Sequence, residues 1–144
     1  MTDLLLATDA DWIADEVEAA LSEPGTEVRR VTAGALVLPA AHEKLPDVVI
    51  LDSQIGNMGG IAACMALRLE ESVDRIPPLP VLILLDRHAD VFLARRSLAD
   101  GWMIKPLDSF RLRRAVRALL DGGRSEEGVT DEDVDVVGTD VAGV

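Results

Sequence analysis

Short apolar runs alternate with amphipathic stretches along the first 120 residues of the chain. Wholly or almost wholly apolar runs are typical of strands buried on both faces of a parallel sheet, and they occur at residues 4–7, 48–51, 81–85 and 102–104. A further run at residues 27–31 alternates polar and apolar positions, which predicts a half-exposed strand at or near an edge. The pattern therefore predicts five strands.

The segments between these runs predict helices. Ile13, Val17 and Leu21 recur at helical spacing, and Pro39 is tolerated in a helix only if that helix begins near Leu38. Further helical segments are predicted at residues 60–71, 90–98 and 109–120. Strands that alternate with helices predict an α/β fold, a (βα)5 doubly wound five-stranded parallel sheet with flavodoxin-like strand order.

The predicted helix at residues 60–71 is apolar on more than one side. Ile61, Cys64 and Leu67 are expected to face the sheet, whereas Met65 and Leu69, with the neighbouring alanines, make most of the other side apolar. A helix that is apolar nearly all round is usually covered by something, although an alanine-rich surface helix gives a similar pattern. Both interpretations stay open.

Length and charge divide the chain into a domain and a tail. The 144 residues are 49% hydrophobic, enough for one domain with a substantial core. We expect that domain at residues 1–121 and a disordered acidic tail at residues 122–144, where no periodicity is found. Of the net charge of −12, residues 121–144 carry eight acids and one base, hence −7, which leaves −5 for residues 1–120. An acidic surface argues against general binding of nucleic acid or anionic membranes.

Cysteine usage and hydropathy indicate the compartment. Cys64 is the only cysteine, so no internal disulfide can form, and we expect a cytoplasmic protein. No run of 18 apolar residues and no charged-then-apolar leader is found, so neither membrane insertion nor a signal peptide is expected. The two histidines and the cysteine are scattered, which argues against a zinc site.

Charged side chains follow three of the predicted strands, where each strand ends. Asp9 follows the first run, Asp52 ends the third, and Lys105 follows the fifth. Because parallel strands present their carboxyl ends at one edge of a sheet, these side chains are expected to gather there. Two carboxylates and an ammonium group suit Mg²⁺ together with a phosphoryl group. Taken alone, Asp52 could equally be the cap of the next helix.

In this order and spacing, the motifs resemble a response-regulator receiver domain of two-component signalling, the CheY-like family, over residues 1 to about 120. The resemblance implies that Asp52 is the phosphoacceptor, which takes its phosphoryl group from a histidine kinase or a phosphotransfer protein. It implies that Asp9, Asp52 and the backbone carbonyl of Gln54 hold Mg²⁺. It also implies that Lys105 pairs with the phosphoryl oxygens.

Four positions complete the comparison, and three of them depart from the family pattern. Trp102 takes the place of the aromatic that changes rotamer on activation, although an amphipathic cover of the core is an equal interpretation. Thr8 replaces an acid, which should weaken Mg²⁺ binding. Leu85 replaces a Ser or Thr and cannot donate a hydrogen bond to a phosphoryl group. Asp86 replaces a small residue and either points inward, where it repels an incoming dianion, or points to solvent.

Two functions stay open and two others are disfavoured. The chain is either a stand-alone receiver that is phosphorylated on Asp52, or a receiver-like module that binds a protein partner constitutively, for instance as a fixed subunit of a larger complex. An aspartate-nucleophile phosphatase commonly has a second acid two residues after the nucleophile. Gln54 occupies that position here, so we do not expect an enzyme. Flavin binding is disfavoured because the acids at residues 9 and 11 would repel its phosphate.

Two surfaces could receive a target protein. The first is formed by the helix at residues 90–98, the strand at 102–104 and the helix at 109–120, whose two helices carry six arginines. A solvated arginine-rich face is the alternative interpretation. The second surface is the apolar helix at 60–71. DNA contact is not expected, because no output domain follows residue 120.

Overall fold

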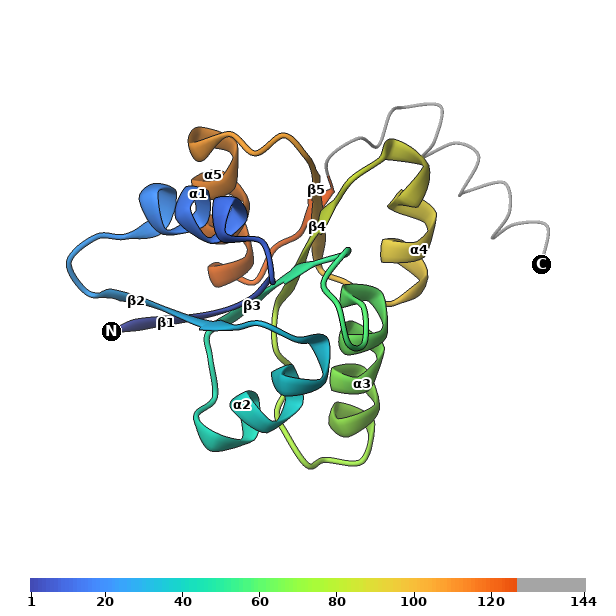
Figure 1. The fold of residues 1–144 in the computed structure, drawn as a ribbon. Helices are drawn as coiled ribbons and strands as arrows, with labels where there is room; N and C mark the ends of the chain where they lie inside the picture. Colours follow the sequence, from blue (N-terminus) through green and yellow to red (C-terminus); the bar gives the residue numbers. More distant parts are fainter. Residues whose placement is uncertain (127–144) are drawn as a thin grey trace.

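All strands that the computed structural model describes lie parallel in one sheet (Figure 1). The structure describes residues 1–126. The strands lie in the order β2-β1-β3-β4-β5-β6. Their bounds are Thr2–Ala7 (β1), Thr26–Val31 (β2), Val48–Asp52 (β3), Val81–Leu85 (β4), Gly101–Ile104 (β5) and Ser125–Glu126 (β6).

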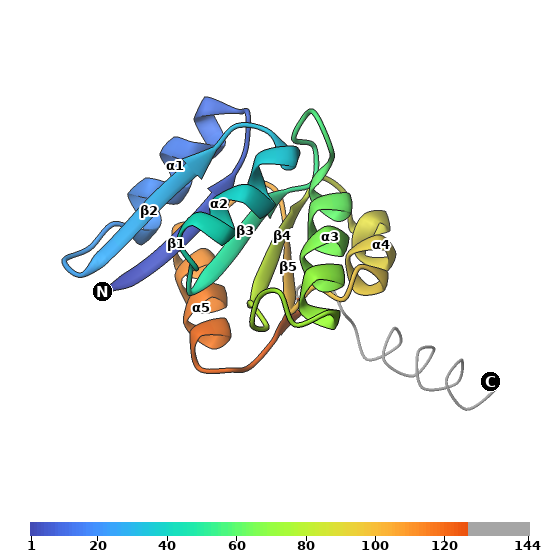
Figure 2. The ribbon, with the colours of Figure 1, turned by 90° about the horizontal axis from the view of Figure 1, so that it is seen from below.

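Helices cover both faces of the sheet (Figure 2). Helices α1 and α5 pack together on one face, and α2, α3 and α4 cover the other. Their bounds are Asp11–Leu21 (α1), Val37–Glu43 (α2), Gly60–Ser72 (α3), Val91–Arg96 (α4) and Ser109–Leu120 (α5), with 3-10 turns at Gly34–Leu36 and His88–Asp90. The doubly wound, flavodoxin-like α/β fold predicted from the sequence is confirmed.

The sheet separates two apolar cores, which explains why its central strands are continuous apolar runs. Within β1, Leu4 and Leu6 pack beneath α1 and α5, while Leu5 and Ala7 face the other helices. Every residue of β3 and β4 is buried. By contrast, among the described strands β2 pairs only with β1 and is mostly half-buried, as the alternation in its sequence predicts for an edge strand.

A sixth strand is the main addition to the predicted fold. β6 pairs with β5 in parallel, and the Ser125 N–H donates to the Asp100 carbonyl at 3.2 Å. The prediction of five strands did not include β6, because a two-residue polar strand has no apolar pattern. Residues 127–144, most of the predicted acidic tail, lie outside the described residues.

The helices follow the predicted pattern with shifted ends. α2 begins at Val37, which places Pro39 in its first turn as expected. α4 is shorter than predicted, because a 3-10 turn ends at Asp90 before the helix begins and Leu98, with a positive φ angle, lies just beyond its end at Arg96. Along α3, Cys64 and Leu67 are buried, whereas Met65 and Leu69 are exposed. Within residues 1–126, none of the helices has the length and apolar character needed to cross a membrane.

Candidate functional site

Asp52 is the last residue of β3, and its carboxylate accepts three hydrogen bonds. The Lys105 ammonium and the Gln54 backbone N–H donate to Oδ1 at 2.7 and 3.1 Å. The Thr8 hydroxyl donates to Oδ2 at 2.7 Å. Only 3% of the Asp52 side chain is exposed. Because a buried carboxylate is costly unless it is paired and hydrogen-bonded, these three donors offset the cost of burying the Asp52 side chain.

Three parallel strands bring these groups together. Thr8 follows β1 and Lys105 follows β5, on either side of β3 in the sheet. The Lys105 N–H donates to the Leu85 carbonyl at 2.7 Å, so the backbone of Lys105 stays attached to the end of β4. The Lys105–Pro106 peptide bond is cis. The arrangement follows from parallel pairing, which aligns the carboxyl ends of all the strands.

Asp86 points inward, and its side chain makes a second ion pair with Lys105. Lys105 Nζ lies 2.7 Å from Asp86 Oδ1 as well as 2.7 Å from Asp52 Oδ1. Of the two orientations considered for Asp86, the one toward solvent is therefore wrong, although 38% of its side chain stays exposed. Burial lowers the pKa of Lys105, but hydrogen bonds and charges from Asp52 and Asp86 outweigh this and leave that pKa raised. The ammonium is thus held in its charged form.

Asp9 lies in the turn after β1 and contacts the loop that follows β3. Its Oδ2 accepts a hydrogen bond from the Gly56 N–H at 3.0 Å. That loop continues through Asn57 and Met58, whose backbones both adopt positive φ angles of 51° and 75°. It ends at Gly60, where an added Cβ would lie 2.5 Å from the Asp52 carbonyl oxygen, so only glycine allows α3 to begin so close to the site.

The donor atoms near Asp52 suit a hard cation, although with little ligand charge. Asp9 and Asp52 offer carboxylate oxygens, the type of ligand that Mg²⁺ prefers. Three of the roughly four lone-pair positions of the Asp52 carboxylate already accept hydrogen bonds from protein groups. Within residues 1–126, no three or more His, Cys, Asp or Glu side chains gather around a common metal position. The residues therefore fit Mg²⁺ held by two carboxylates and additional neutral oxygens.

Leu85 and Trp102 are both core residues. Leu85 is fully buried among apolar side chains on the face covered by α2, α3 and α4. Trp102 is also fully buried there, and its indole Nε1 has no hydrogen-bond partner among the described residues. The Arg95 guanidinium lies 5.7 Å from the centre of the Trp102 ring. The position agrees with the interpretation of Trp102 as a cover of the core, while its role in switching stays a prediction.

Sequence reasoning missed how Thr8 and Asp86 interact with the other site residues. The sequence predicts that Thr8 removes a metal-binding charge, but it did not predict that the Thr8 hydroxyl contacts Asp52 directly. For Asp86 the sequence left open whether the side chain points inward, and it did not predict the ion pair with Lys105. In both cases the signal is a polar residue directly after, or directly at, the end of a buried strand. Its direction depends on the turn that follows.

A doubly wound parallel sheet with a buried aspartate and lysine at its carboxyl edge defines a class of α/β signalling module. Receiver domains have this architecture. The sequence model of the response regulator receiver domain matches residues 4–117, so the chain belongs to that family.

Comparison with individual proteins gives the same family. The transcriptional regulatory protein AfsQ1 of Streptomyces coelicolor is 30% identical over 128 residues, which are 88% of this chain and 54% of that protein. A putative response regulator from Chloroflexus aurantiacus superposes with a TM-score of 0.75 at 26% identity, over 83% of this chain and 98% of that one. The chemotaxis regulator CheY4 of Vibrio cholerae shares the fold, with a TM-score of 0.73 at 24% identity over 83% and 98% of the two chains. The chain spans about half the length of the curated relatives it matches.

Proposed function

We propose that the protein is a receiver that accepts a phosphoryl group on Asp52 and acts through protein–protein contacts. The observation that carries this proposal is the buried pair of Asp52 and Lys105, 2.7 Å apart at the carboxyl edge of the sheet. The donor would be a histidine kinase or a phosphotransfer protein. The single buried cysteine, Cys64, supports a cytoplasmic location.

The transfer needs a carboxylate nucleophile and a cation for the transferred group. An oxygen of Asp52 attacks the phosphorus of a phosphohistidine, the N–P bond breaks, and an acyl phosphate forms. Oδ2 accepts one hydrogen bond and Oδ1 accepts two, so Oδ2 keeps more lone-pair density for attack. Lys105 is charged and close enough to pair with the phosphoryl oxygens.

Magnesium would be held by Asp9, Asp52 and the backbone carbonyl of Gln54. When bound, the ion neutralises charge on the phosphoryl oxygens. With Thr8 in place of an acid, the site offers less ligand charge, so we infer weakened affinity. Asp9 would release or share the contact that it makes with the Gly56 N–H in order to bind the ion.

A second function is favoured by one specific observation, the ion pair of Asp86 with Lys105. Asp86 already supplies the anion that a phosphoryl group would otherwise present to this lysine. Leu85 is buried and has no hydroxyl with which to follow a phosphoryl group. A receiver-like module could bind its partner without phosphorylation, for instance as a fixed subunit of a larger complex. Such a module is compatible with both the Asp86–Lys105 ion pair and the leucine at position 85.

Two surfaces support target docking in either case. The face formed by α4, β5 and α5 carries exposed arginines, among them Arg96 and Arg114. On α3, the exposed Met65 and Leu69 give an apolar alternative.

Intact mass spectrometry after incubation with Mg²⁺ and acetyl phosphate tests the proposal. We expect the mass of one phosphoryl group on the unmodified chain and none on Asp52→Asn. Asp15→Asn, which removes an exposed acid of α1, is the matched control and should still be modified. An absent adduct on the folded wild-type chain, or an adduct that survives Asp52→Asn, would refute phosphorylation at Asp52. The absence of an adduct on the folded chain would support the constitutive module instead.

A further inference from the structure

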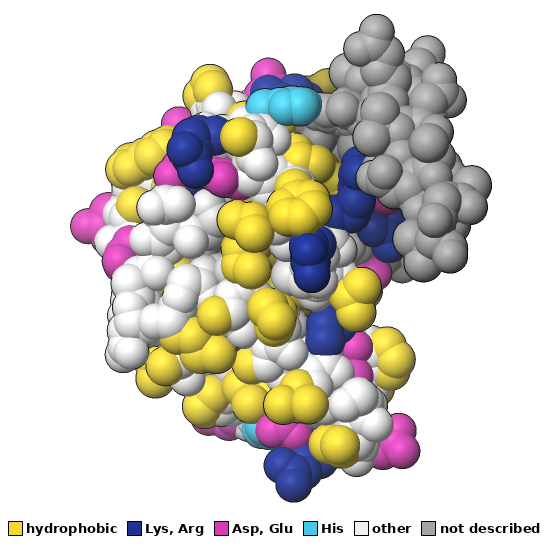
Figure 3. Space-filling model, turned by 90° about the vertical axis from the view of Figure 1, so that its right-hand side faces the viewer, with side chains coloured by type: hydrophobic (Ala, Val, Ile, Leu, Met, Phe, Trp, Pro, Cys, Tyr) yellow, Lys and Arg dark blue, Asp and Glu magenta, His cyan; other side chains and the backbone are white. Residues whose placement is uncertain are grey.

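An apolar groove runs along the surface between α3 and α4. We call it the α3–α4 groove, and its walls are formed by Ala62, Met65, Ala66 and Leu69 from α3 and by Arg96 and Leu98 from the other side. Met65, Leu69 and Leu98 are 57%, 67% and 66% exposed. Figure 3 shows hydrophobic side chains gathered on this face of the molecule, with basic side chains beside them. Contiguous exposed apolar surface of this kind marks an interaction site.

A leucine at position 98 is unfavourable for the stability of the fold. Its backbone has a φ of +65°, in the left-handed region where a side chain is disfavoured and glycine is the usual residue. Two-thirds of its side chain is nevertheless exposed, so burial in the core does not offset that strain. Backbone strain of this kind clusters at functional sites.

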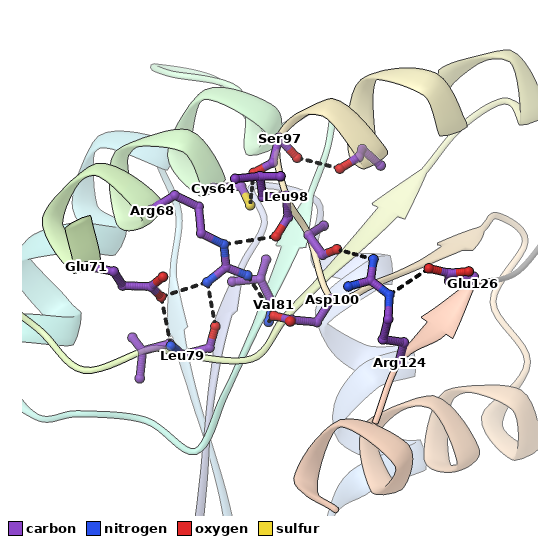
Figure 4. Close-up of polar contacts among 12 residues, drawn as sticks. Cys64, Arg68, Glu71, Leu79, Val81, Ser97, Leu98, Asp100, Arg124 and Glu126 are labelled. Carbon is purple, nitrogen blue, oxygen red and sulfur yellow. Dashed lines mark hydrogen bonds and ion pairs between the residues drawn. The ribbon is translucent and has the colours of Figure 1, made fainter. Parts of the chain in front are cut away.

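Two arginines hold the strained loop in place (Figure 4). Arg68 of α3 donates from Nε to the Leu98 carbonyl at 2.9 Å and from Nη2 to Asp100 at 2.6 Å. From the opposite side, Arg124 donates from Nη2 to the Ala99 carbonyl at 3.0 Å. The loop is therefore fixed by α3 and by the segment that leads into β6, with the Leu98 side chain presented to solvent.

The same contacts determine where the chain leaves the described domain. Arg124 also pairs with Glu126 at 2.6 Å, and Glu126 lies beside Trp102 in the sheet. The segment after Glu126 thus starts next to β5, the strand that the loop at Leu98 leads into. Eighteen residues, 127–144, can span up to ~59 Å when extended, whereas a helix with its side chains is about 10 Å wide. This length is ample to pass over α4 and reach the groove.

Charge and composition favour this segment as the occupant. The residues that line the groove include Arg68 and Arg96 and no acid, and α4 adds Arg95. Residues 127–144 contain six acids, six valines and no basic residue, in a chain with a net charge of −12. The run Asp133-Val134-Asp135-Val136 alternates the two types. A segment that alternates in this way can turn valines toward apolar walls and acids toward arginines.

We propose that residues 127–144 dock in the α3–α4 groove of the same chain. Valines pack against Met65, Leu69 and Leu98, and the acids pair with Arg95 and Arg96. Tethering raises the effective concentration of the segment, so weak contacts suffice. The docked segment covers the apolar face of α3 and competes there with any target protein, whether or not Asp52 is phosphorylated.

Paramagnetic broadening in the full chain tests this docking. A nitroxide is attached to an Ala142→Cys variant, in which Cys64 stays buried and is not labelled. We expect selective broadening of the methyl signals of Met65, Leu69 and Leu98. Double replacement of Arg95 and Arg96 by Glu should remove most of it, and so should Leu98→Gly. Leu45→Gly, which removes an exposed leucine outside the groove, should leave the broadening unchanged.

Leu98→Gly keeps the test independent of folding. Glycine relieves the positive φ angle, so the melting temperature should not fall, and lost broadening would then report lost docking. Three outcomes would overturn the proposal. One is the absence of broadening at the groove, which would leave it open to another protein. The second is equally strong broadening when spin-labelled copies are mixed with unlabelled, isotope-enriched copies, which would indicate docking on a second copy. The third is broadening insensitive to Leu98→Gly and to the arginine replacements.

Discussion

The Lys105 ammonium lies 2.7 Å from the Asp86 carboxylate, the same distance that separates it from the Asp52 carboxylate. One cation is therefore shared between the proposed phosphoacceptor and a second acid at the end of β4. A phosphoryl group on Asp52 would have to compete with Asp86 for Lys105. If Asp52 is the phosphoacceptor, Asp86 would oppose its phosphorylation both by repulsion and by pairing with the lysine.

Removal of the second acid should favour phosphorylation. In Asp86→Asn, Lys105 keeps its contact with Asp52 but is free to pair with an incoming phosphoryl group. The partly exposed ion pair is worth at most about 1 kcal/mol, which corresponds to a rate increase of up to about fivefold with acetyl phosphate. Mass spectrometry over time measures the rate. Asp74→Asn, an exposed acid distant in sequence from the site residues, is the control, and an equal increase there would indicate a general charge effect.

Replacement of Thr8 by Asp should create a site that depends on magnesium. Thr8 is fully buried and its hydroxyl is 2.7 Å from Asp52, so a carboxylate there would face another carboxylate. Without metal, Thr8→Asp should lower the melting temperature. Saturating Mg²⁺ should raise it more than it raises that of the wild type, because ligand charge increases affinity. Thr8→Val is the control, and equal Mg²⁺ responses of all three proteins would contradict a metal site beside Asp52.

Arg68 should be hard to replace, even by lysine. Its guanidinium contacts Glu71, the Leu79 carbonyl, the Leu98 carbonyl and Asp100, all at 2.6 to 2.9 Å. Lysine keeps the charge but lacks the planar fork that reaches several acceptors. We expect Arg68→Lys to lower the free energy of unfolding by roughly 2–4 kcal/mol in urea titrations. Arg75→Lys, at a largely exposed arginine, should change it little.

Asp3 should make stability depend on acidic pH. Burial raises its pKa, but hydrogen bonds and charges from Lys44 and Arg29 outweigh that effect and lower the pKa overall. A carboxyl group whose pKa is lowered by folding stabilises the protein above its ordinary pKa of 3.8, and this contribution is lost as the pH falls through the lowered value. Asp3→Asn should therefore be less stable than the wild type at neutral pH by about 1 kcal/mol.

The difference between Asp3→Asn and the wild type should shrink as the pH falls below about 4. Urea unfolding at several pH values between 7 and 2.5 measures it, with Asp15→Asn as the control. A difference that stays constant across this range would show that the Asp3 charge does not act through Arg29 and Lys44.

The alternation of apolar runs and helical spacing predicted the fold class, because burial on both faces of a parallel sheet demands continuous apolar strands. The same reasoning placed Asp9, Asp52 and Lys105 at strand ends, where parallel pairing alone aligns them. The exposed apolar side of α3, seen at Met65 and Leu69, was also readable from the sequence. These features depend on periodicity and on chain order, which the sequence states directly.

Only the tertiary structure decided how the polar side chains pair. The direction of Asp86, the hydrogen bond from Thr8 to Asp52 and the pairing of β6 with β5 depend on the turns around them. The positive φ angle of Leu98 and its attachment to Arg68 involve residues 30 positions apart. A side chain near a strand end has several rotamers of similar energy, and its choice is fixed by partners that the fold brings close. Periodicity carries no information about those partners.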